Sequence, residues 1–77
     1  MYEKIDKKIM KIMGEKLVAR KSELVEYVKN DVKSNPGDPR RVVDSITKNL
    51  IQRGFIIPLY ASETTFAITQ KGMREVR

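Results

Sequence analysis

Cysteine and histidine are both absent from this 77-residue sequence. Their absence excludes disulfide bonds, thiolate or imidazole metal sites, cysteine nucleophiles and any catalytic triad that uses histidine. Glu23 and Glu26 are the nearest approach to an acid–base pair, and acids beside lysines are ordinary surface residues. We therefore expect no enzymatic activity, no metal site and no cofactor.

Long apolar stretches are missing as well. No run approaches the roughly 18 residues that a membrane-spanning helix needs, and the lysine-rich start lacks the unbroken apolar block of a signal peptide. The sequence thus predicts a cytoplasmic protein with no membrane partner. A chain of this length has room for one compact core, so we expect residues 1–77 to form a single domain.

Basic residues are abundant. Sixteen Lys and Arg residues against ten Asp and Glu residues give a formal net charge of +6. Polyanions are the favoured partners of such a chain, with nucleic acid ahead of an anionic membrane surface. The charge does not locate the binding surface, because the basic run at residues 4–11 also fits an ordinary solvated helix face.

The clearest local signal is a helix predicted over residues 39–53. Asp38 is a good N-cap, Pro39 suits the first helical position, and Gly54 can close the other end in a left-handed conformation. The apolar positions that helical spacing places on one side are Val42, Val43, Ile46 and Leu50. The other side carries Arg41, Asp44, Ser45, Lys48 and Gln52.

Two shorter helices and a strand are predicted before this segment. Apolar spacing indicates a first helix over residues 2–13, ended by Gly14, and a second over residues 23–33, capped by Ser22. Residues 16–20 favour a short strand, and residues 34–39 are rich in turn formers.

A β-hairpin is predicted after Gly54. Residues 55–60 are β-branched and aromatic, residues 65–69 alternate with a period of two, and Pro58 belongs on an edge strand. Thr69 is expected to cap a last helix over residues 70–76. The side chains expected to cover the helices are Phe55, Ile57, Leu59, Phe66 and Ile68.

Two blocks carry a resemblance to a known family. Leu50-Ile51-Gln52-Arg53-Gly54-Phe55-Ile56 and Phe66-Ala67-Ile68-Thr69-Gln70-Lys71-Gly72 are similar to the end of the third helix and the close of the wing in the winged helix-turn-helix superfamily, as found in small archaeal and bacterial transcription regulators. The resemblance implies an α+β winged helix: a three-helix core, a C-terminal β-hairpin wing and a short terminal helix.

The resemblance also implies that the third helix lies in the major groove of DNA. Arg41 would contact a guanine, Lys48 a phosphate, and the start of the second helix the DNA backbone. The implied DNA-binding residues are Arg40, Arg41, Ser45, Lys48, Gln52, Lys21 and Ser22. Asp44 departs from this pattern, and would repel phosphate unless it reads a cytosine amino group or pairs with Arg40, Arg41 or Lys48.

Two functions follow as hypotheses. The first is a DNA-binding module of a transcriptional regulator, with double-stranded DNA as its partner. The alternative is a winged-helix protein-protein interaction module of a larger transcription, replication or other multi-subunit assembly, favoured by Asp44, Ile51 and an acidic wing tip at Glu63. A wing that only completes the sheet, a homodimer through the first helix, a monomer and a fragment of a longer protein all stay open.

Overall fold

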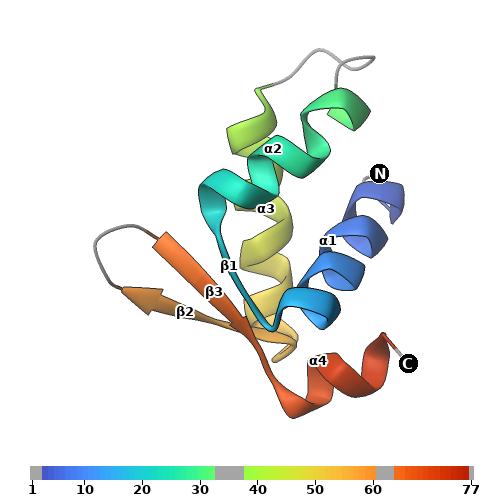
Figure 1. Ribbon diagram of the computed structural model, residues 1–77, viewed down its shortest axis with the longest axis vertical. Helices are drawn as coiled ribbons and strands as arrows, with labels where there is room; N and C mark the ends of the chain where they lie inside the picture. Colours follow the sequence, from blue (N-terminus) through green and yellow to red (C-terminus); the bar gives the residue numbers. More distant parts are fainter. Residues whose placement is uncertain (1–2, 33–37, 61–63, 77) are drawn as a thin grey trace.

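A computed structural model describes residues 3–32, 38–60 and 64–76 (Figure 1). The elements in chain order are α1 (Glu3–Lys16), β1 (Val18–Arg20), α2 (Lys21–Val32), α3 (Pro39–Gln52), β2 (Ile56–Tyr60), β3 (Thr64–Ile68) and α4 (Gln70–Glu75). Within these ranges the protein has four helices and one antiparallel sheet with strand order β1-β3-β2. The predicted α+β class is confirmed. Residues 34–37 of the predicted turn at 34–39 and the hairpin tip at 61–63 lie outside the described residues.

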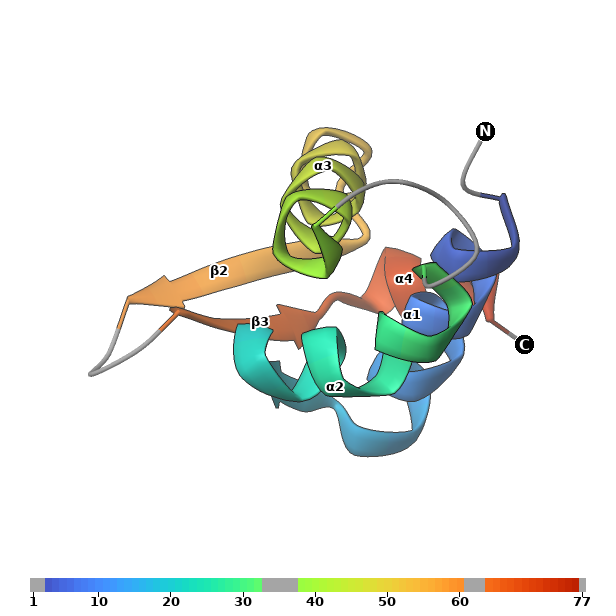
Figure 2. The same ribbon diagram turned by 90° about the horizontal axis from the view of Figure 1, so that it is seen from above.

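The helices gather on one side of the sheet. Figures 1 and 2 show α2 and α3 covering it, with the β2–β3 hairpin extending beyond them and α4 beside α1. One apolar cluster joins buried side chains from α1, α2, α3 and the sheet. None of the helices in the described ranges is long and apolar enough to cross a membrane.

The ends of α3 are as predicted. The Asp38 side chain accepts a hydrogen bond from the backbone N–H of Arg40 at 3.0 Å, and Pro39 occupies the first turn. Gly54 closes the other end with φ +79°, a backbone conformation that glycine adopts without steric cost. Four predicted apolar positions and one threonine form the buried side: Val42, Val43, Ile46, Thr47 and Leu50.

Two predicted helix boundaries are wrong. Helix α1 continues past Gly14 to Lys16 and ends where Leu17 takes a φ of 68°. A Cβ built at Gly14 would lie 2.9 Å from Val76 Cγ2, so the glycine lets α1 approach the end of α4 closely. Helix α2 follows β1 directly and begins at Lys21, so Ser22 lies inside its first turn instead of capping it.

On β2 the buried face is out of phase with the prediction, whereas on β3 Phe66 is buried and Ile68 packs against the core as predicted. Ile56 and Phe66 are buried under the helices, whereas Ile57 and Leu59 are 49% and 39% exposed on the opposite face. Pro58 pairs with Phe66, and Ile57 pairs with Ala67. Phe55 is buried as expected, but it precedes β2, so the alternation of side chains starts at Ile56. Strand β2 is an edge strand, as the proline predicted.

Thr69 caps α4 as predicted. Its hydroxyl accepts from the backbone N–H of Gly72 at 3.0 Å and donates to the carbonyls of Gly54 at 2.6 Å and Phe55 at 3.0 Å. A Cβ at Gly72 would stand only 2.2 Å from the Phe55 carbonyl oxygen, so only glycine fits this contact. The start of α4 is thereby held against the chain that leaves α3.

Candidate nucleic-acid interface

Helix α3 presents one polar stripe to solvent. The side chains of Arg41, Ser45, Lys48 and Gln52 are all exposed. Steps of four, three and four residues bring them onto one line along the helix. Because the opposite side of α3 is buried in the core, the stripe is held in a fixed orientation on a rigid element.

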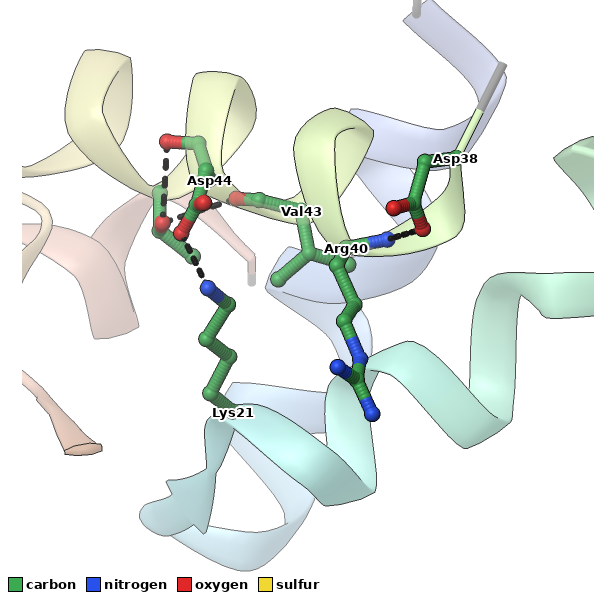
Figure 3. Close-up of polar contacts among 6 residues, drawn as sticks. Lys21, Asp38, Arg40, Val43 and Asp44 are labelled. Carbon is green, nitrogen blue, oxygen red and sulfur yellow. Dashed lines mark hydrogen bonds and ion pairs between the residues drawn. The ribbon is translucent and has the colours of Figure 1, made fainter. Parts of the chain in front are cut away.

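Arg40 belongs to a separate group. Its side chain extends from α3 toward the start of α2 (Figure 3). There it lines a hollow of about 400 Å³ between the two helices and the start of β3. The residues around the hollow are Lys21, Ser22, Val25, Glu26, Arg40 and Thr64. The Glu26 carboxylate accepts from Lys29 at 2.6 Å, and the cations that border the hollow are Lys21 and Arg40.

The partner of Asp44 differs from those predicted. Its carboxylate lies 2.5 Å from Nζ of Lys21, across the gap between α3 and α2 (Figure 3). The partners that the sequence suggests for a pair, Arg40, Arg41 and Lys48, all lie on the same helix as Asp44, and a cytosine contact is the alternative. The lysine reaches it because β1 leads straight into α2, which places Lys21 opposite the middle of α3.

The structure thus divides the predicted DNA-binding residues into two neighbouring sets. Arg41, Ser45, Lys48 and Gln52 form the stripe, and Lys21, Ser22 and Arg40 line the hollow. All are exposed except Lys21, which is half-buried. The sequence pattern did not indicate that Thr64 borders the hollow or that Lys21 meets Asp44, because both contacts join segments far apart in the chain.

The basic run of α1 lies among acidic residues. Lys8 pairs with Asp31 of α2 at 2.7 Å. Lys7 and Lys11 border a second hollow of about 500 Å³, together with Asp6 and Glu75 and an apolar floor that includes Met10 and Phe55. Arg53 also borders this hollow and lies 3.8 Å from Asp6, so both hollows are lined by cations and acids together.

Neither hollow has the character of a metal site. Across residues 3–32, 38–60 and 64–76, no three acidic side chains come together in a way that would hold a metal ion.

No family model, no curated protein sequence and no solved structure matches this chain.

Proposed function

We propose that this chain is a winged-helix domain of a transcriptional regulator, and that it binds duplex DNA with α3 in the major groove. The observation that carries the proposal is the exposed stripe of Arg41, Ser45, Lys48 and Gln52 on a helix whose other side is buried. The order helix, strand, helix, helix, hairpin supports the winged-helix assignment. An α-helix with its side chains fits the width of the major groove.

Each group of residues has its own task in this proposal. Arg41, near the start of α3, would donate two hydrogen bonds to a guanine, while Lys48 would contact a phosphate. Lys21 and Arg40 would hold the DNA backbone at the hollow, where the first turn of α2 also presents N–H groups. The stripe would then supply sequence readout and the hollow would fix the position of the duplex.

Fluorescence anisotropy of a labelled mixed-sequence duplex across a salt series tests this proposal. Neutralising about four phosphates should give a log–log slope of about −3.6. The variant Arg41→Glu/Lys48→Glu should weaken binding at least about tenfold, since each contact is worth about 1–3 kcal/mol.

The matched control is Lys4→Glu/Lys11→Glu on α1, which changes the net charge by the same amount at two exposed positions. It should weaken binding much less than the α3 variant. Equal losses in the two variants would show that binding follows net charge alone, and would overturn the placement of DNA on α3.

One observation favours the second candidate, an interaction module that does not read DNA sequence. Val18, Ala67 and Ile57 lie side by side across the outer face of the sheet, and Val18 and Ile57 are each 49% exposed. Arg20 is the one charged residue at the paired positions of this face. Such a surface suits an apolar patch on another protein. Ile51, by contrast, is partly buried and packs against the core, so it adds little apolar surface.

A further inference from the structure

Asp44 is an acid placed among the residues proposed to read DNA. It is three residues from Arg41, next to Ser45 and four residues from Lys48. Its side chain is 58% exposed, whereas that of Lys21 is 29% exposed. The carboxylate therefore faces the solvent that a DNA duplex would replace, and the lysine that it binds is the more enclosed partner.

The ion pair with Asp44 engages Lys21, a cation that the proposed DNA-binding site needs. Lys21 borders the hollow proposed for the DNA backbone, yet its ammonium group lies 2.5 Å from the Asp44 carboxylate. A phosphate that recruits Lys21 must compete with this carboxylate, which also repels the phosphate directly. The Asp44 carboxylate therefore weakens binding to DNA of unselected sequence. This penalty would disappear if the carboxylate accepted a hydrogen bond from another donor on the DNA.

We propose, on the basis of the DNA-binding function above, that Asp44 is a specificity-determining residue. In the free protein it holds Lys21. On DNA, Lys21 turns to a phosphate and Asp44 accepts a hydrogen bond from the N4 amino group of a cytosine in the major groove. Sites without a cytosine at that position leave the carboxylate unpaired beside phosphates, so they bind weakly.

The substitution Asp44→Asn tests the restraint on Lys21, because it removes the charge and keeps the shape. Affinity for a mixed-sequence duplex should rise about 1.5- to fivefold, the range expected from releasing one exposed ion pair. The log–log salt slope should steepen by about 0.9, since Lys21 gains one phosphate.

The matched control is Asp31→Asn, which makes the same change in net charge and releases Lys8 from a pair of 2.7 Å on the α1 side of the molecule. It should raise affinity clearly less than Asp44→Asn. In a Lys21→Ala background the gain from Asp44→Asn should shrink, because no lysine remains to be released.

Selection from a randomised duplex library tests the cytosine contact. The wild-type protein should enrich sites with a cytosine that the Asp44→Asn variant no longer prefers. Binding that depends on α3, but responds equally to Asp44→Asn and Asp31→Asn, or an unchanged preference after selection, would overturn this role alone. Binding that is indifferent to Arg41→Glu/Lys48→Glu would overturn the proposed function and this role with it.

Discussion

At the scale of single residues, Lys16 and Glu23 connect the end of α1 to the first turn of α2. Their charged groups lie 2.9 Å apart, and the Lys16 ammonium also stands 5.5 Å from the centre of the Tyr27 ring. The hydrogen bond from Lys16 is the main cause that lowers the pKa of Glu23. The same bond is the main cause that raises the pKa of Lys16.

These shifts define a pH window for the stability that the pair contributes. The stability contributed by Glu23 is present at pH values above its ordinary pKa of 4.5. It is lost as the pH falls through the lowered pKa of the folded protein. The stability contributed by Lys16 is present at pH values below its ordinary pKa of 10.5. It is lost as the pH rises through the raised pKa of the folded protein.

Urea denaturation of the wild type and Glu23→Gln across pH measures this contribution. The wild type should be more stable than the variant at neutral pH. The difference should be small, because the pair is exposed and screened by water. The difference should close at both pH extremes and shrink in 1 M salt. A difference that persists unchanged at strongly acidic pH would contradict the assigned cause of the shifts.

At the scale of elements, the register of the hairpin decides which side chains support the core. Ile56 is fully buried, whereas its neighbour Ile57 is half-exposed on the outer face. Two adjacent isoleucines in one strand therefore have opposite environments, and their substitution separates the two faces of the sheet.

Ile56→Ala should lower the free energy of unfolding by about 2–4 kcal/mol, because it leaves a cavity among the helices. Ile57→Ala should cost under about 1 kcal/mol, since that side chain is partly solvated already. Urea unfolding followed by circular dichroism compares the two variants directly. Similar losses at both positions would contradict the observed register.

The elements also differ in how far the sequence determines them. Helix α3 is predictable because Asp38, Pro39 and Gly54 mark its ends by local chemistry. The faces of β2 are not, because Phe55, Ile56 and Ile57 are all apolar and no alternation shows which of them points inward.

The candidate site likewise combines residues that the sequence predicts with contacts that it does not. The stripe on α3 follows from helical spacing alone, so its members are readable from the sequence. The pair of Lys21 and Asp44 requires α2 to lie against α3 in a particular register, and the two residues are too far apart in the chain for local spacing to indicate it. Tertiary packing therefore supplies what the sequence pattern lacks.

At the scale of the whole molecule, the proposed DNA-binding surface is one of three distinct faces. The α3 side carries the polar stripe and the hollow of Lys21 and Arg40. The α1 side mixes cations with acids, and the outer face of the sheet is largely apolar. Because the faces differ in chemistry, the location of bound DNA distinguishes the two candidate functions.

The most direct measurement is a titration of the ¹⁵N-labelled protein with a mixed-sequence duplex, followed by amide chemical shifts. If α3 lies in the major groove, the largest changes should fall on Arg41, Ser45 and Lys48 of α3 and on Lys21 at the start of α2, with little change along α1. Changes confined to α1 or to the outer face of the sheet would show that α3 is not the DNA-binding helix.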